Sequence, residues 1–151
     1  MAYSWVIYAF LSAIFAALVT VFAKIGLSKV DATTATVIRA VIMAVFLVVV
    51  LGFSGKFGEI TKLVGDYKVF GFIILSGVAG ALSWLFYFIA VKAGNATLVA
   101  SIDRLSLVFI FIFSLIFIKE KFTNIEYIGV GFVSLGILLI AFGKYILSYI
   151  K

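Results

Sequence analysis

Long apolar runs separated by short polar connections form the pattern of this chain. A helix rises about 1.5 Å per residue, so about 20 apolar residues cross the hydrocarbon core of a bilayer. Five runs reach that length, and they predict spanning helices over residues 4–26, 33–53, 69–91, 97–118 and 125–146. The longest connection, residues 54–68, mixes glycine with charged residues and is expected to lie partly on the membrane surface. We therefore expect an all-α integral membrane protein with one five-span domain over residues 1–151.

The composition agrees with lipid as the solvent. Hydrophobic residues make up 66% of the chain and charged residues 12%, whereas a soluble domain is about 45–50% apolar and about 25% charged. The net charge of +6 is spread over the connections and fits contact with anionic lipid headgroups. Because the basic residues form no patch, the lipid bilayer is an expected partner and nucleic acid is not.

Cysteine and histidine are both absent from the sequence. Their absence excludes disulfides, thiol nucleophiles, histidine bases and the usual zinc sites. No predicted helix face carries paired carboxylates either. We therefore expect no metal, no cofactor and no enzymatic activity.

The lysines of the connections and of the span ends are divided evenly between the two sides of the predicted bundle. The side of the N-terminus and the opposite side carry five lysines each: Lys56, Lys62, Lys68, Lys119 and Lys121 against Lys24, Lys29, Lys92, Lys144 and Lys151. Orientation normally follows an excess of Lys and Arg in the cytoplasmic loops, and none exists here outside the spans. One interpretation is a single orientation that other details fix. The other is dual topology, in which the chain inserts both ways and a five-span unit pairs with an inverted copy.

Several charged side chains lie inside the predicted spans, where each costs about 2.5–3.5 kcal/mol on insertion scales. Asp103 and Arg104 lie about two turns into the fourth span, and Arg39 lies about two turns into the second. Lys24 and Lys92 lie near the ends of the first and third spans. All five lie towards the same side, so a compact bundle would gather four cations and one anion at one end.

Two interpretations of this charged end are open. Adjacent helix residues point about 100° apart, so we expect Asp103 to pair with Arg39 or Lys24 rather than with Arg104. In the first interpretation, a salt bridge between Asp103 and Arg39 only fixes two helices. In the second, Arg39 and Arg104 bind an anionic or zwitterionic substrate, since Arg suits bidentate recognition of carboxylate or phosphate, and Asp103 is a coupling or orienting carboxylate. Ser106 continues the side of Asp103, either as a polar track or as an ordinary helix contact.

Small residues predict close helix packing in two spans. Gly129, Gly136 and Gly143 recur every seven residues in the fifth span, and Gly80 pairs with Ser76 in the third. Small side chains let helix backbones approach closely in lipid. We favour packing within one chain over a subunit interface, and the two do not exclude each other.

Trp84 and Tyr87 lie three residues apart, well inside the third span rather than at its ends. They share a helix face, and their N–H and O–H groups need partners in an apolar setting. Either they bond to the backbone or to Ser83, or they form the wall of a substrate cavity.

Short strings in a fixed order support a family resemblance. In the second half they are Tyr-Phe-Ile-Ala-Val-Lys-Ala-Gly at 87–94, Val-Ala-Ser-Ile-Asp-Arg-Leu-Ser at 99–106, the loop 118–123, and the pairs 128–129 and 136–137. The first half fits more loosely, through residues 22–26 and 39–40. In these strings the chain resembles the EamA-type drug/metabolite transporter superfamily. In its five-span, single-unit subgroup, known from bacteria and archaea, the fourth-span string often reads Pro-Ile-Asp-Lys/Arg-Leu-Ser, and this chain has Ser101 at the position of the proline.

The resemblance implies a secondary transporter of small metabolites, often an exporter, that works by alternating access. It also implies the plasma membrane of a bacterium or archaeon as the location. Most relatives carry the five-span unit twice in inverted orientation, so a single unit is expected to form a homodimer as an inverted repeat. The alternatives are a lipid-linked phosphate flippase and a non-transporting membrane scaffold or partner subunit. A cation exporter like the small multidrug-resistance proteins is disfavoured, because the first span has no acidic residue.

Overall fold

A computed structural model describes residues 4–150, with side chains described for residues 4–143. The chain divides into two compact units within Met1–Ala93 and Gly94–Lys151, here called unit 1 and unit 2, and each is described by itself. The prediction of a single five-span domain stays a prediction. Lys151 and the side chain of Lys144, both part of the lysine tally, lie outside the described residues.

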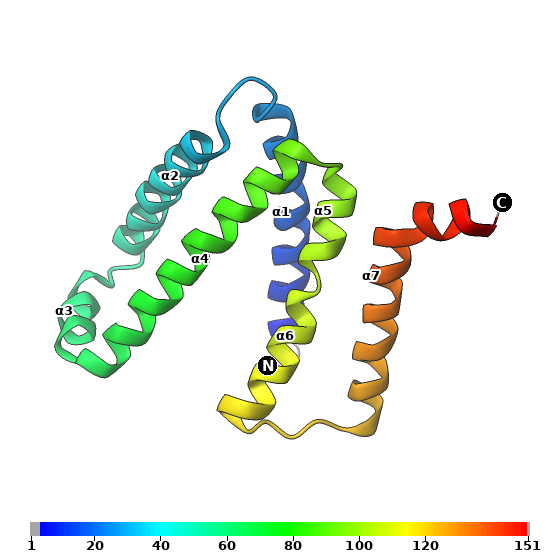
Figure 1. The fold of residues 1–151 in the computed structure, drawn as a ribbon. Helices are drawn as coiled ribbons and strands as arrows, with labels where there is room; N and C mark the ends of the chain where they lie inside the picture. The colour runs from blue at the N-terminus through cyan, green and yellow to red at the C-terminus, as the bar shows by residue number, and fades with distance from the viewer. Residues whose placement is uncertain (1–3, 151) are drawn as a thin grey trace. The chain divides into compact units, whose positions relative to one another are not determined.

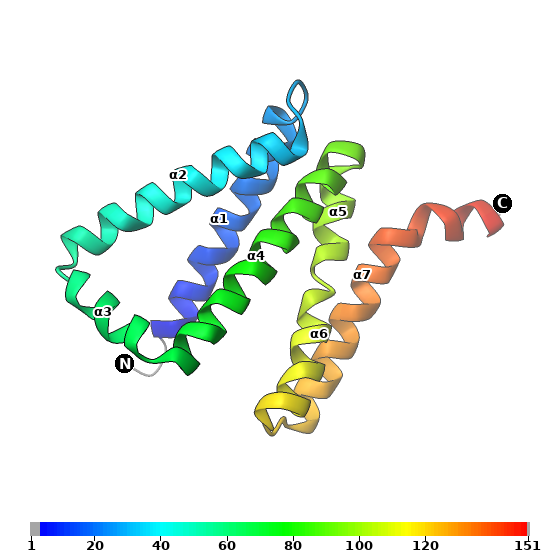
Figure 2. The same ribbon diagram turned by 60° about the vertical axis from the view of Figure 1, so that its left-hand side comes forward.

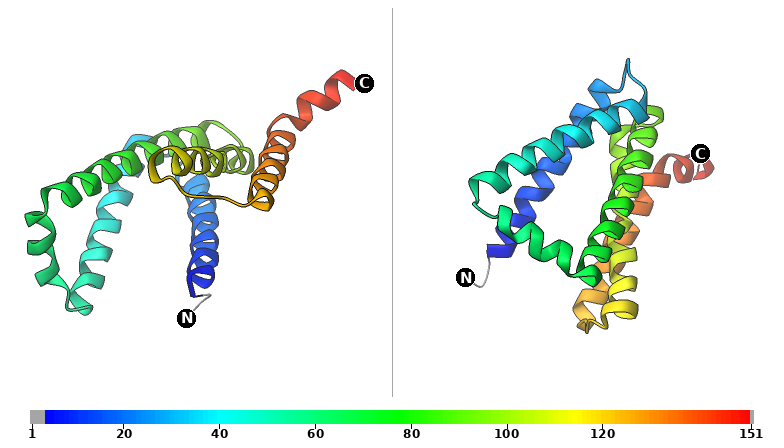
Figure 3. Two further views of the ribbon diagram at one scale, coloured as in Figure 1. Left: turned by 90° about the horizontal axis from the view of Figure 1, so that it is seen from below. Right: turned by 90° about the vertical axis from the view of Figure 1, so that its left-hand side faces the viewer.

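Unit 1 contains four helices, and the last of them in the chain contacts the other three. They are α1 (Ser4–Gly26), α2 (Ala32–Phe53), α3 (Phe57–Gly65) and α4 (Tyr67–Ala93) (Figure 1). The short helix α3 lies across the ends of α2 and α4 that it joins (Figure 3). Three of these helices are long and apolar enough to cross a membrane, and α3 is too short.

Helix α3 lies in the connection 54–68, for which the apolar pattern predicted no spanning helix. Its apolar residues Phe57, Ile60 and Val64 follow a spacing of three and four and so share one face, and all three are partly exposed. Glu59 and Lys62 occupy other positions of the same helix. Gly55 has a positive φ of 66°, a conformation that glycine adopts without strain, and it turns the chain out of α2. The connection is therefore a short amphipathic helix.

Unit 2 consists of α5 (Ala96–Asp103), α6 (Ser106–Phe113), the π-helical turn η1 (Ser114–Ile118) and α7 (Asn124–Ile150). Helix α7 contacts both α5 and α6. Figure 2 shows the α5–α6 segment and α7 side by side, with a loosened turn between α5 and α6. Taken together, 96–118 is long and apolar enough to span, as is Asn124–Gly143. Five candidate spans are thus confirmed within the described residues.

The predicted fourth span is divided rather than uniform. Around the division, backbone N–H groups bond three residues back instead of four: Leu105 N to Ile102 O at 2.9 Å, Leu107 N to Arg104 O at 3.0 Å, and Val108 N to Leu105 O at 2.9 Å. Such a tight stretch inside a helix is a common site of bending. Within α5, the Ser101 hydroxyl donates to Thr97 O at 2.8 Å, a bond that also tends to bend helices. The division therefore forms without a proline.

The loop between η1 and α7 is held by two local structures. Lys119 ends η1 in the left-handed region, at φ 59°. At the start of α7 the Glu126 carboxylate accepts from both Thr123 N, at 2.6 Å, and the Thr123 hydroxyl, at 2.8 Å. Both bonds run from Thr123 to one carboxylate oxygen, which is one half of a capping box, and the Glu126 N–H bonds to Thr123 O at 3.0 Å. The loop that carries part of the family resemblance is thus a helix start signal.

Candidate functional site

The central feature of unit 1 is an arginine stacked on a tryptophan. The Arg39 guanidinium carbon lies 3.7 Å from the centre of the Trp84 ring and 5.4 Å from the centre of the Phe88 ring. Arg39 comes from α2 and both rings come from α4, so the contact joins the two helices. Among the described residues, no carboxylate pairs with Arg39 and no acceptor bonds to it. An aromatic face is attracted to a cation by its quadrupole but does not neutralise the charge.

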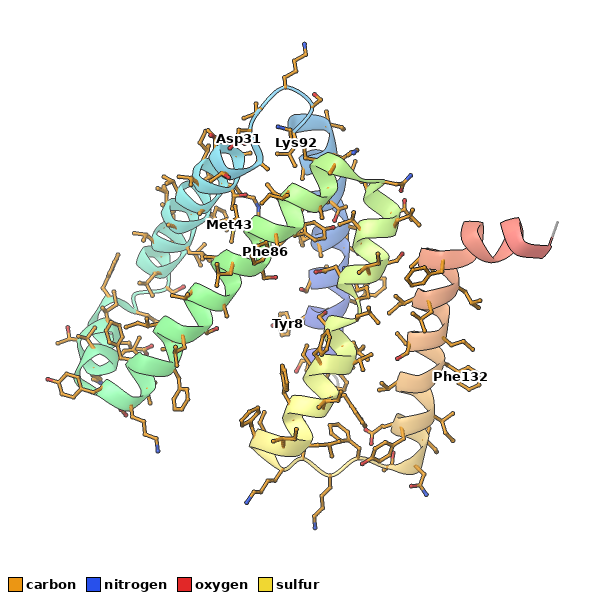
Figure 4. All side chains as sticks on the ribbon, viewed as in Figure 1. Tyr8, Asp31, Met43, Phe86, Lys92 and Phe132 are labelled. Carbon is orange, nitrogen blue, oxygen red and sulfur yellow. The ribbon has the colours of Figure 1, made fainter. Side chains whose placement is uncertain are left out.

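A groove of about 730 Å³ runs between α2 and α4 beside this pair. Arg39 and Trp84 are among its lining residues, and Met43 lies on the α2 side, between the two helices (Figure 4). Arg39 is the one charged residue that lines it. The full lining is Thr33, Thr36, Val37, Arg39, Ala40, Met43, Ala44, Leu47, Ser76, Gly77, Gly80, Ala81, Trp84 and Leu85. The lining is otherwise apolar, apart from three hydroxyl groups.

Tyr87 lies on another face of α4 and does not line this groove. Its hydroxyl is 2.6 Å from the Thr20 hydroxyl of α1. The Thr20 hydroxyl donates its single proton to Ala16 O at 3.0 Å, so Tyr87 must be the donor in the pair. The Tyr87 ring also meets the Trp84 ring edge to face, with centroids 5.6 Å apart. Tyr87 therefore bonds to a side chain of another helix, whereas its expected partners were the backbone or Ser83.

Lys24 and Lys92 bond to backbone carbonyls at the same end of unit 1. Lys24 Nζ donates to Val91 O of α4 at 2.8 Å, and Lys92 Nζ donates to Val30 O of the α1–α2 loop at 2.9 Å. The Lys24–Val91 bond lies one helical turn beyond the Thr20–Tyr87 bond on both helices. Helices α1 and α4 are therefore parallel and in register here. Val91 lies in the last turn of α4, so Lys24 satisfies a carbonyl that the helix end leaves unpaired and favours the helix dipole.

Asp31 provides the N-cap of α2 near Lys92 (Figure 4). Its carboxylate accepts from Thr34 N at 3.0 Å. This backbone hydrogen bond, aided by the positive charge of Lys92, holds the pKa of Asp31 below its ordinary value. The charged end of unit 1 thus includes one exposed carboxylate that the sequence interpretation did not single out.

Asp103, Arg104 and Ser106 lie at the division of the fourth span, in unit 2. Asp103 is the last residue of α5, Arg104 caps α5, and Ser106 is the first residue of α6. All three side chains are exposed, and no ion pair joins Asp103 to Arg104 among the described residues. The expected pairing of Asp103 with Arg39 or Lys24 would join the two units, and it stays a prediction.

Comparison with known proteins identifies the family. The sequence profile of the EamA-like transporter family matches residues 3–142 of the chain. The chain belongs to the EamA-like transporter family. It is also 39% identical over 141 residues to a Sinorhizobium protein named as an uncharacterized transporter in the cobO 3' region, covering 93% of this chain and 99% of that protein. No solved structure matches the chain.

Family membership and the five apolar helices together establish a multi-pass membrane protein. The family and the relative both indicate a transporter rather than an enzyme. Of the predicted residues of this EamA-like transporter, the structure brings Arg39, Trp84 and Gly80 to one groove. Tyr87 and Lys24 join α1 to α4 instead. The groove lining on α2 has a readable signal, since Ala40, Ala44 and Leu47 repeat every three or four residues, but the sequence does not say which helix faces it.

The four glycines predicted to pack helices have open space around them within their units. A Cβ placed on Gly80, Gly129, Gly136 or Gly143 would meet no other atom within 4 Å. Gly80 lines the α2–α4 groove. Gly129 lines a smaller groove of about 380 Å³ between α6 and α7, which also includes Ser114 at its η1 end. Close packing of the glycine faces is thus not seen within either unit, and their packing role stays a prediction.

Proposed function

We propose that this EamA-like transporter is a homodimeric secondary transporter that exports a small polar or anionic metabolite by alternating access. The observation that supports an anionic substrate is the position of Arg39, whose guanidinium carbon lies 3.7 Å from the centre of the Trp84 ring beside the α2–α4 groove. A cation inside a spanning segment is costly and marks a substrate or ion pathway by default. Here the charge is held by aromatic rings and not by a carboxylate of its own unit. An anionic group on the cargo would supply that partner.

The proposal of a homodimer rests on the size of the Sinorhizobium relative. The Sinorhizobium relative is matched over 99% of its own length by 141 residues, so it has the size of one unit. Transporters of this plan combine two inverted units around a central pathway. The equal lysine tally and the open glycine faces fit a second copy in inverted orientation. We propose the plasma membrane of a bacterium or archaeon as the location, following the same family resemblance.

Alternating access requires an element that changes shape, and the divided fourth span is our candidate. Asp103 and Arg104 lie at the division itself, where the backbone bonds are of the tight three-residue kind. A carboxylate in this place would couple proton movement to a change in the bend. Asp103→Asn would then abolish transport driven by a pH gradient and preserve exchange without a gradient. Undiminished driven transport in that variant would remove the coupling role.

A ligand-stabilisation screen tests the substrate class. Purified protein is heated with a panel of small carboxylates, phosphates, amines and neutral sugars, and the midpoint of unfolding is recorded. We expect stabilisation by anions in the wild type and its loss in Arg39→Gln. Lys68→Gln removes the same charge at an exposed position outside the groove and is expected to behave as the wild type. Stabilisation by amines, or anion stabilisation that persists in Arg39→Gln, would contradict the proposal.

The alternatives are separated by transport itself. A lipid-linked phosphate flippase would move a lipid-linked phosphate between the leaflets of proteoliposomes and would not accumulate a soluble anion. A membrane scaffold would do neither. If the protein is a scaffold, Asp103→Asn is expected to lower the unfolding temperature, with no loss of transport that can be separated from this loss of stability. Uptake of a soluble anion that depends on Arg39 would exclude both.

A further inference from the structure

The α2–α4 groove has one charge and a long apolar remainder, and this distribution restricts what it can bind. Arg39 is the one charged side chain of the lining, with the hydroxyls of Thr33 and Thr36 towards one end. From Arg39 to Leu47 the α2 side extends about 12 Å, at about 1.5 Å per residue. Along that length the lining is aliphatic or small, except for Ser76 on α4. The charge of the groove is thus confined to one end, and the rest of the lining has the Ser76 hydroxyl as its one polar group.

The Arg39 guanidinium remains able to bind an anion at that end. The Arg39 guanidinium carbon lies over the Trp84 ring, 3.7 Å from its centre, and we infer from this short distance that the ring covers one face of the guanidinium. The N–H groups lie in the guanidinium plane, so they are directed away from the ring. No described acceptor takes them. A carboxylate can therefore accept two parallel hydrogen bonds while the stacking persists.

The apolar remainder excludes a second charge on the ligand. A second charged group would lie against Ala40, Met43 or Leu47 with no residue of opposite charge in the lining, and burying a charge without one is costly. The same surface binds an apolar chain by removing it from water. Gly77 and Gly80 leave space there, since a Cβ on either would meet no atom within 4 Å.

From this distribution we infer that the groove binds an amphiphilic monoanion, a soluble carboxylate with one negative group and an unbranched apolar body. The carboxylate bonds to Arg39 and the body lies between α2 and α4 along Gly77 and Gly80. The inference rests on the proposed function, because the groove is the proposed cargo site. It narrows the cargo from any small polar or anionic metabolite to monoanions with an apolar chain.

Trp84 itself reports binding. The chain has two tryptophans, Trp5 and Trp84, so Trp5→Phe leaves Trp84 as the sole tryptophan. This variant is placed in phosphatidylcholine nanodiscs and titrated with acetate, hexanoate, octanoate, the octanoate methyl ester and suberate, the eight-carbon dicarboxylate. We expect Trp84 emission to respond to octanoate at lower concentration than to acetate, and not to the ester. Suberate is expected to bind at least about tenfold more weakly than octanoate.

Two variants on this background test the two ends of the groove separately. Arg39→Gln is expected to weaken octanoate binding about tenfold or more, because a charge-assisted hydrogen bond is lost. Gly80→Leu fills the apolar part without meeting another atom at Cβ. It is expected to weaken octanoate binding while leaving acetate binding unchanged, and Lys68→Gln is expected to change neither. Gly80→Leu thus tests the inference even if Arg39→Gln fails to fold.

Several outcomes would overturn the inference. Equal affinity for acetate and octanoate, or tight binding of suberate, would show that the apolar part takes no ligand. No response of Trp84 to any carboxylate would show that another element, such as a second copy, fills the groove. Displacement of octanoate by phosphatidylglycerol added to the nanodiscs would assign the groove to a bilayer lipid. These experiments measure binding, whereas the proposed function is tested by transport. A protein that binds octanoate but does not transport it would contradict the proposed function and not this inference.

Discussion

At the residue scale, the side chains of α4 connect three helices by different forces. Trp84 and Phe88 hold Arg39 of α2, Tyr87 bonds to Thr20 of α1, and the Val91 carbonyl accepts from α1. These positions recur every three or four residues, so they fall on neighbouring faces of one helix. The arrangement places an uncompensated cation beside a groove and fixes both neighbouring helices around it.

The Thr20–Tyr87 bond gives a prediction for stability. Tyr87→Phe removes the donor and Thr20→Val removes the acceptor, so each is expected to lower the free energy of unfolding by about 0.5–1.5 kcal/mol. The double variant is expected to cost less than the sum, because both changes remove one bond. The measurement is unfolding in mixed detergent micelles. Tyr8→Phe is the control, since that side chain is 71% exposed, and additive costs in the double variant would contradict the assignment.

Single residues show how far the sequence could predict the site. Arg39 and Trp84 each stand out in the sequence, because a charge and a central aromatic are unusual inside a span. Their contact could not be derived, since the sequence does not specify which faces of two apolar helices meet. The sequence predicted that Asp103, which lies in unit 2, pairs with Arg39 or Lys24, and this pairing stays a prediction. Within unit 1, Arg39 lies against an aromatic ring that the sequence did not assign to it.

At the element scale, the five spans were predictable and the internal structure of the fourth was not. Length and apolarity define a span, and helices α1, α2, α4 and α7 begin within one or two residues of the predicted positions. Between Ile102 and Leu107 there is neither proline nor glycine, and Ser101 stands where the five-span subgroup that the chain resembles often has proline. The division depends on the backbone bonding, and the hydroxyl of Ser101 is a residue-type signal too weak to predict it. The amphipathic helix α3 was missed because its apolar face is only two turns long.

The division between α5 and α6 predicts local opening. Bonds that reach three residues back have poorer geometry than those of a regular helix. In hydrogen exchange measured by mass spectrometry in nanodiscs, the amides of residues 104–109 are expected to exchange faster than those of residues 75–90 in α4. Equal protection of the two segments would show that the fourth span is a uniform helix.

The cap of α2 predicts a dependence on pH. Because the folded pKa of Asp31 is lowered, its charge stabilises the fold above the ordinary aspartate pKa, and this contribution is lost as the pH falls through the lowered value. Asp31→Asn keeps an oxygen acceptor for Thr34 N but has no charge. Its unfolding temperature is therefore expected to be lower than that of the wild type at neutral pH and to converge with it in acid. Glu59→Gln on α3 is the control, and a constant difference across the pH range would contradict the assignment.

At the scale of the whole molecule, the even distribution of lysines allows two interpretations, and we test the one in which the chain inserts in both orientations. The chain has no cysteine, so single cysteines at Ser28 and Ser54, on opposite predicted sides, report orientation without changing the tally. Asn95 is less suitable, because its side chain caps α5 through Thr97 N and Leu98 N. Each cysteine is expected to be labelled from both faces of the membrane. Adding one charge with Ser54→Lys is expected to shift the cysteine at Ser28 towards one face.

Labelling of each cysteine from a single face would exclude dual topology. It would leave the transporter assignment intact, since that rests on the family and the five spans. A homodimer of parallel copies would then be the arrangement to test, for example by cross-linking the same cysteines.

The central claim is that Arg39, held on Trp84 beside the α2–α4 groove, binds the negative group of the transported cargo. Uptake into proteoliposomes of the carboxylate that stabilises the purified protein most strongly tests it directly, with wild type, Arg39→Gln and Lys68→Gln reconstituted in equal amounts. Uptake by Arg39→Gln is expected to fall about tenfold or more at limiting concentration, with Lys68→Gln unchanged. Wild-type uptake by a folded Arg39→Gln protein would contradict the claim.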